Sequence, residues 1–145
     1  GENHDSKLNF TLAALAHDCM EAIGAPRFTE EEKAYARQVA QAVGLPGVEG
    51  ELDESILPVD GTIKKDNGSS DVADVSQIVP VVNINTACYG RKTPNHSWAV
   101  TVQADKPAAH RGMLFAAKTL ALMGTRLATE PTLLAAVRAE FEQAE

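Results

Sequence analysis

Val81-Val-Asn-Ile-Asn-Thr-Ala-Cys-Tyr89 is the segment on which the predicted fold class depends. Its side chains alternate along the chain, with Val82 and Ile84 on one face and Asn83 on the other, and a period of two is typical of a β-strand. A second alternation, of Trp98, Val100 and Val102, predicts another strand over residues 97 to 103. Because helical patterns flank both segments, we expect an α/β layer of a few strands covered by about four to five helices.

The first two predicted helices have clear boundaries. Residues 10 to 23 place six side chains on one helical face, and these are Leu12, Leu15, Ala16, Cys19, Met20 and Ile23. Gly24 should end this helix. Thr29 and Glu32 have the spacing of a capping box that opens a second helix, and Gly44 should close that helix.

The longest predicted helix covers residues 106 to 127. Its part from Met113 to Leu127 is apolar almost all round, so we expect this helix to be mostly buried. A final helix should follow Ala128, with Thr129 or Thr132 as its N-cap.

A long loop separates the second helix from the first predicted strand. Helical periodicity fails between residues 45 and 70, where Gly, Pro, Asp and Ser accumulate. Loops of this length are often functional, and a small-molecule site in the acidic stretch from residue 49 to 74 is one possibility. A short helix over residues 71 to 78, capped by Ser70 or Asp71, should follow.

Composition excludes several classes of protein. The chain has 145 residues, 44% of them hydrophobic and 23% charged, which is typical of one globular domain and not of a disordered chain. No apolar run approaches the roughly 18 residues of a membrane span, and the N-terminus does not resemble a signal peptide. We expect a cytoplasmic protein whose two cysteines, Cys19 and Cys88, are reduced core residues.

Charge is unevenly distributed along the chain. The formal net charge is −7; residues 1 to 74 carry 15 acids and 6 bases, whereas residues 75 to 145 carry 5 acids and 7 bases. Nucleic-acid binding requires a dense basic face. The sequence has none, so nucleic acid is not an expected partner, and a small or anionic ligand suits the second half better.

Two places in the sequence could carry chemistry. His96 occupies a turn-rich loop, Thr93-Pro-Asn-His-Ser-Trp98, where the backbone can present a side chain beside the ends of the predicted strands. Asp71 and Asp74 would share a face of the short helix, although helix capping is the simpler role for such residues. The other histidines, His4, His17 and His110, have the positions of ordinary solvent-facing or capping residues.

Four motifs resemble those of one enzyme family. In order along the chain they are Gly68-Ser-Ser-Asp-Val-Ala-Asp-Val-Ser76, Thr86-Ala-Cys88, Thr93-Pro-Asn-His-Ser-Trp98 and Gly112-Met-Leu-Phe-Ala-Ala-Lys-Thr-Leu-Ala121. They are similar to the C-terminal catalytic region of the aminobenzoyl-glutamate utilisation B proteins and their amidohydrolase relatives, in the aminoacylase and glutamate-carboxypeptidase superfamily of metallopeptidases. The resemblance covers about residues 9 to 142, and residues 1 to 8 are expected to be a linker or an added head. Within the motifs, Ser70 replaces the usual Thr and Ala73 the usual Gly.

The resemblance implies an amidase that uses two divalent metal ions, zinc or manganese, to cleave amides of N-acyl amino acids such as p-aminobenzoyl-glutamate. In such enzymes most metal ligands come from an N-terminal half of the catalytic domain. By the match, His96 is the one ligand carried by this chain, with Asp71, Asp74 and Ser97 close to the substrate or orienting the ligands. The chain would then be inactive by itself, and would pair with the missing half or form a homo- or hetero-oligomer.

A second hypothesis remains open. The chain could be a non-catalytic interaction module or subunit that keeps the scaffold and binds a partner chain through an exposed surface. Retention of His96 and of both aspartates favours the enzyme.

Overall fold

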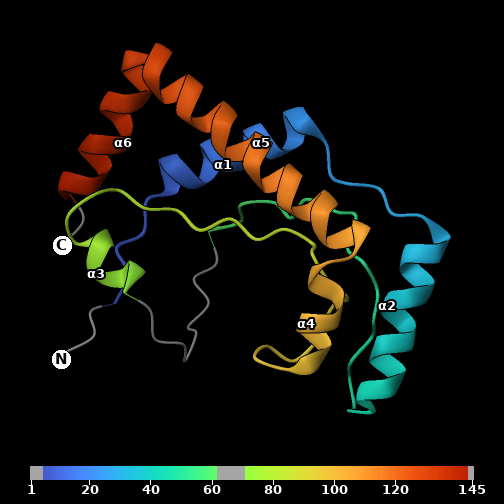
Figure 1. Ribbon diagram of the computed structural model, residues 1–145. Helices are drawn as coiled ribbons and strands as arrows, with labels where there is room; N and C mark the ends of the chain where they lie inside the picture. The colour runs from blue at the N-terminus through green and yellow to red at the C-terminus, as the bar shows by residue number, and fades with distance from the viewer. Residues whose placement is uncertain (1–4, 62–70, 144–145) are drawn as a thin grey trace. The chain divides into compact units, whose positions relative to one another are not determined.

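The computed structural model describes residues 5–61 and 71–143 (Figure 1). The chain divides into two compact units. Its helices are α1 (Phe10–Ile23), α2 (Glu30–Val43), α3 (Val72–Ser76), α4 (Trp98–Ala104), α5 (Pro107–Thr129) and α6 (Pro131–Gln143). The first unit contains the described residues within Gly1–Ala22, Leu57–Ile84 and Thr119–Glu145, and the second contains Ile23–Ile56 and Asn85–Lys118. Helix α5 contributes residues to both units.

The predicted α/β fold is wrong, because the described residues form helices and irregular segments without any strand. Residues 81 to 89 are an irregular segment that pairs with no other described segment. A strand is stable only when a neighbouring strand satisfies its backbone N–H and C=O groups. The alternating pattern is therefore present, but no described segment pairs with it.

The second predicted strand, residues 97 to 103, is mostly helix α4. The apolar alternation of Trp98 and Val102 is misleading here, since both side chains are exposed and the buried positions are Ala99 and Gln103, one helical turn apart. The Gln103 side chain fixes this helix, because its amide donates to the carbonyl of Ala99 at 2.8 Å and accepts from the N–H of Gly90 at 3.1 Å. Tertiary contacts thus override a weak β propensity.

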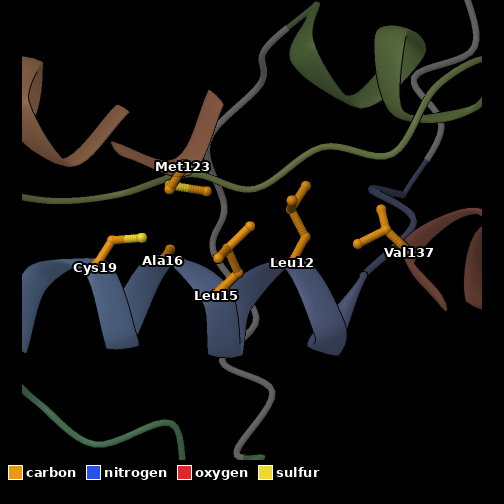
Figure 2. Packing of buried hydrophobic residues seen from close by; sticks show 6 residues of the cluster. All are labelled: Leu12, Leu15, Ala16, Cys19, Met123 and Val137. Atoms are coloured by element: carbon orange, nitrogen blue, oxygen red, sulfur yellow. The ribbon is translucent and has the colours of Figure 1, made fainter. Parts of the chain in front are cut away.

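The core of the first unit lies along α1. Four of the six predicted core residues of this helix are buried, and they pack with one residue each from α5 and α6 (Figure 2); the cluster is Leu12, Leu15, Ala16, Cys19, Met123 and Val137. The predicted helix over residues 10 to 23 is confirmed. Cys19 is fully buried, as expected for a core residue, whereas Cys88 is only partly buried.

The N-terminus of α1 is held by polar groups that the sequence pattern did not indicate. Asn9 accepts a hydrogen bond from the N–H of Leu12 at 2.8 Å and donates one to the carbonyl of Val137 at 2.9 Å. The carboxylate of Glu140 in α6 accepts from the N–H groups of Phe10 and Thr11, at 2.7 and 2.8 Å. Negative charge at a helix N-terminus is stabilising, so this contact fastens α6 to α1.

Glu140→Gln is expected to lower the free energy of unfolding at neutral pH by about 1 kcal/mol. Burial raises the pKa of Glu140, but the hydrogen bonds from Thr11 and Phe10 outweigh it and the net pKa lies below the ordinary 4.5. The contribution is therefore present above pH 4.5 and lost as the pH falls through the folded-state pKa. Urea unfolding over this range should show a shallower acid dependence for Glu140→Gln, and the exposed control Glu142→Gln should be as stable as the wild type at neutral pH. Equal behaviour of the two variants would contradict the contact.

Helix α2 lies in the second unit, and its two ends are where the sequence predicts them. Thr29 caps α2 and forms the complete capping box with Glu32, and Gly44 closes the helix with φ of 64°. The apolar core here comprises Phe28, Ala36, Leu52 and Ala108, with Ala87 packed against it. Both boundary predictions are confirmed, because capping is decided by neighbouring residues.

Helix α5 is less buried than predicted. Its buried residues follow one face at helical spacing, and they are Ala108, Ala109, Gly112, Phe115, Thr119 and Met123. On other faces Met113, Leu114 and Leu120 are 56, 53 and 53% exposed. The described residues cover one side of this helix, so the apolar residues beyond that side remain in contact with solvent. None of the described helices is long and apolar enough to cross a membrane.

Two predicted caps differ from the structure. Thr129 is the last residue of α5 and donates to the carbonyl of Thr125 at 2.9 Å, while Thr132 lies inside α6, so neither caps α6. The short helix predicted over residues 71 to 78 is α3, and Asp71 precedes it without a capping hydrogen bond from its side chain. Ser70 lies outside the described residues.

Candidate functional site

His96 lies on an exposed turn just before α4. Its φ is 56°, in the left-handed region that a residue with a side chain seldom adopts. Such a conformation costs of order 1 kcal/mol and persists where surrounding contacts hold it. The turn therefore presents the imidazole to solvent in a defined place.

Short polar contacts fix this turn from both sides. Thr93 donates from its hydroxyl to the carbonyl of Gly90 at 2.6 Å, and Ser97 donates to the carbonyl of Pro94 at 2.6 Å. The hydroxyl of Tyr89 donates to Asn95 at 3.1 Å. Each turn of the loop is thus closed by a side chain, and His96 is one of the exposed polar residues of the loop.

An open hollow of about 570 Å³ lies beside His96 in the second unit. Asn95, His96, Ser97 and Trp98 line one part of it, and Val100 and Thr101 of α4 line the rest. Trp98 is 54% exposed, so a flat apolar surface lies next to the imidazole. The hollow is open to solvent and brings together an imidazole, hydroxyl and amide groups and an aromatic ring.

The base of the loop is tied to the acidic segment that follows α2. Lys92 pairs with the carboxylate of Glu49, and this contact together with Arg91 holds the pKa of Glu49 below its usual range. Glu49 is thereby used as a structural counter-ion. It is therefore not a free carboxylate for binding a ligand.

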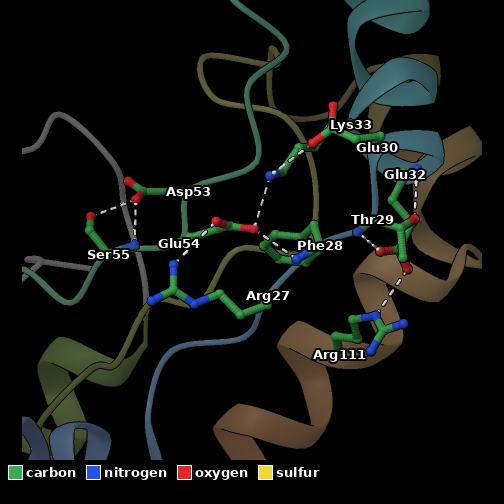
Figure 3. A network of polar contacts seen from close by, with 10 residues as sticks. All are labelled: Arg27, Phe28, Thr29, Glu30, Glu32, Lys33, Asp53, Glu54, Ser55 and Arg111. Carbon is green, nitrogen blue, oxygen red and sulfur yellow. Dashed lines mark hydrogen bonds and ion pairs between the residues drawn. The ribbon is translucent and has the colours of Figure 1, made fainter.

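Glu54, in the same acidic segment, is also engaged in internal contacts (Figure 3). It accepts from the N–H of Phe28 at 2.8 Å and pairs with Lys33 and Arg27, each at 3.3 Å. The hydrogen bond from Phe28 is the largest cause of its lowered pKa. Asp53 accepts from both the N–H and the hydroxyl of Ser55. A small-molecule site in the acidic stretch therefore gains no support from these residues; residues 62 to 70 lie outside the described part.

Asp71 and Asp74 lie in the first unit, directly before α3 and within it, and both are exposed. His96 and Ser97 lie together in the second unit. The structure therefore groups the four predicted site residues as two pairs. The remainder of the first motif, residues 68 to 70, lies outside the described part.

A metal centre would need more ligands than the described residues bring together. Zinc takes at least three protein side chains, and no group of three or more His, Cys, Asp or Glu side chains in residues 5–61 and 71–143 is placed to hold a metal ion. The imidazole of His96 suits zinc or manganese in its chemistry, but it is a single ligand. The described part of this chain does not by itself form the site that the resemblance implies.

Two residues that position the site were missed in the sequence. Gln103 accepts a hydrogen bond from the N–H of Gly90 at the start of the loop. The sequence feature that could have indicated this role is a polar residue one helical turn after Ala99. A Cβ on Gly112 of α5 would lie only 2.3 Å from the carbonyl oxygen of Ala87 and 2.7 Å from the Cys88 sulfur. This glycine allows the segment leading to the loop to contact the helix backbone.

Comparison with known proteins gives one informative match. No protein-family model and no solved structure matches the chain. Over 158 aligned residues it is 28% identical to a p-aminobenzoyl-glutamate hydrolase subunit of Escherichia coli (strain K12), an alignment that covers 93% of this chain. The chain spans about a third of the length of that relative, 33%. The similarity confirms the resemblance carried by the four motifs: the chain is similar to this hydrolase subunit along almost its whole length.

Proposed function

We propose that this chain is the C-terminal part of the catalytic domain of a metal-dependent amidohydrolase that cleaves N-acyl amino acids such as p-aminobenzoyl-glutamate. The observation that carries the proposal is the similarity to a hydrolase subunit along almost the whole chain. The geometry of the His96 loop is consistent with it, because an exposed imidazole on a fixed turn is available to a site completed by other residues.

In this proposal His96 contributes one imidazole nitrogen to a dinuclear centre held mainly by residues outside this chain. Two divalent ions, zinc or manganese, would supply Lewis-acid chemistry there. Ser97 fixes the turn through its bond to Pro94, which orients the imidazole. Asp71 and Asp74 are proposed to orient ligands or substrate near the same centre.

The chain by itself is expected to hydrolyse no p-aminobenzoyl-glutamate above the background rate of the added metal ion. A single histidine ligand cannot fix a catalytic metal, which requires three protein ligands and a bound water. The measurement is release of p-aminobenzoate by the purified 145-residue chain with zinc or manganese. Cleavage that a chelator abolishes would contradict this expectation.

The test of the proposal itself uses the complete open reading frame that encodes the chain. This reading frame should continue upstream into further metal-ligand motifs, and its product should cleave p-aminobenzoyl-glutamate or a related N-acyl amino acid in a metal-dependent way. A product that binds metal ions and cleaves none of these amides would overturn the assignment of activity.

A second candidate function is a non-catalytic interaction module or subunit. In this candidate function the exposed apolar side chains of α5, Met113, Leu114 and Leu120, would contact the partner chain. The relative's own name describes a subunit. A reading-frame product that associates with a partner or with itself, and shows no hydrolysis, would favour this candidate.

A further inference from the structure

We propose that a second hollow in the second unit, separate from the one beside His96, binds a compact carboxylate that carries an apolar body. This hollow has a volume of about 240 Å³ and is lined by the linker between α1 and α2 and by the first half of α5. Three of its eight lining residues are cations, and none is acidic; the cations are Arg27, Arg111 and Lys118. All lining residues belong to the second unit. No residue of the hollow belongs to the His96 loop, so binding at the two places can be tested separately.

Arg111 is oriented by a fixed carboxylate (Figure 3). Its Nε donates to Oε1 of Glu32 at 3.0 Å, while the other oxygen of Glu32 accepts from the N–H of Thr29 at 2.7 Å. The Glu32 side chain is only 9% exposed. Burial raises the pKa of Glu32, but the bonds from Thr29 and Arg111 outweigh it, so the net pKa is lowered. The structure shows no other described partner for the terminal nitrogens of Arg111, which are therefore available to an anion.

Lys118 and Arg27 add positive charge to the same hollow. Lys118 follows Arg111 by seven residues, which places both on one face of α5, and it forms no ion pair with another described residue. Arg27 is 80% exposed and, among the described residues, pairs with Glu54 alone, whose carboxylate is shared with Lys33 and a backbone N–H. The charges of these cations are thus incompletely balanced by acids on the protein.

The rest of the lining indicates what the anion should carry. Ile23, Pro26 and the half-exposed Leu114 give the hollow an apolar wall. A guanidinium binds a carboxylate through two parallel hydrogen bonds, and an apolar body on that carboxylate would cover the wall. Pockets for drug-sized ligands measure about 300–1,000 Å³. This hollow is smaller, so the ligand is a compact organic acid.

NMR titration of the ¹⁵N-labelled 145-residue chain with N-benzoylglycine tests the proposal. Saturable shifts are expected for the amides of Gly24 and of residues 111 to 118. Lys118→Gln should weaken binding about tenfold, the usual loss when one charged hydrogen bond is removed. The control Arg138→Gln removes an exposed cation from α6 and should leave the affinity unchanged. If Lys118→Gln does not fold, Arg27→Gln takes its place with the same expectation.

Two further probes separate charge from shape. N-benzoylglycinamide keeps the apolar body without the carboxylate, and inorganic phosphate keeps negative charge without the body. Both should bind at least about tenfold more weakly than N-benzoylglycine. The proposal is overturned if N-benzoylglycine gives no saturable shifts at these amides, if Lys118→Gln and Arg138→Gln bind equally, or if either probe matches N-benzoylglycine.

Discussion

His96→Ala is expected to abolish amide hydrolysis by the product of the complete reading frame, while changing the unfolding free energy of this chain by no more than about 0.5 kcal/mol. The imidazole is exposed, so its removal costs little folding energy. A metal ligand, by contrast, cannot be replaced by water without loss of the geometry that activates the bound hydroxide. The two effects therefore separate a ligand from a structural histidine.

Activity and metal content of the complete product, together with thermal melts of the chain, are the measurements. Because His96 has a φ of 56°, His96→Asn is the better second variant, since asparagine tolerates this conformation and also lacks the imidazole. The exposed His110 supplies the control His110→Ala, which should keep full activity. A large destabilisation of the chain by His96→Asn, with full metal content and activity in the complete product, would mean that His96 is structural.

Gly112→Ala is expected to destabilise the chain strongly, with a loss of about 3 kcal/mol or more. The new Cβ would lie 2.3 Å from the carbonyl oxygen of Ala87 and 2.8 Å from its carbonyl carbon. These are backbone atoms, so they cannot rotate away as a flexible side chain would. The segment before the His96 loop would have to move away from α5.

Gly124→Ala in the same helix is the matched control. Apart from its chain neighbours and the backbone of its own helix, no described atom lies within 4 Å of a Cβ placed on Gly124, so alanine adds helix propensity without a clash. This variant should stabilise the chain by about 0.5–1 kcal/mol. Denaturant unfolding of both variants tests the contact, and a Gly112→Ala variant as stable as the wild type would show that α5 and the Ala87 segment do not pack as described.

Features that depend on near neighbours could be predicted from the amino-acid sequence. Helix α1 and its buried face follow from apolar spacing, and the start and end of α2 follow from Thr29, Glu32 and Gly44. The motifs around His96 also carried the family resemblance that the comparison confirms. In each case the interacting residues lie within a few positions of one another, or within one motif, so that a linear pattern contains the information.

Tertiary contacts determined which of the other patterns are realised. The alternation from Val81 to Tyr89 produces a strand only when another strand supplies its hydrogen bonds, and no described segment does so. The segment from Trp98 to Val102 also alternates, but it forms part of helix α4, which buries Ala99 and Gln103. Burial of α5 depends likewise on what covers each of its faces. Pairing and burial are properties of segments distant in the sequence, and a period of two or of 3.6 residues states which side chains share a face but not what that face contacts.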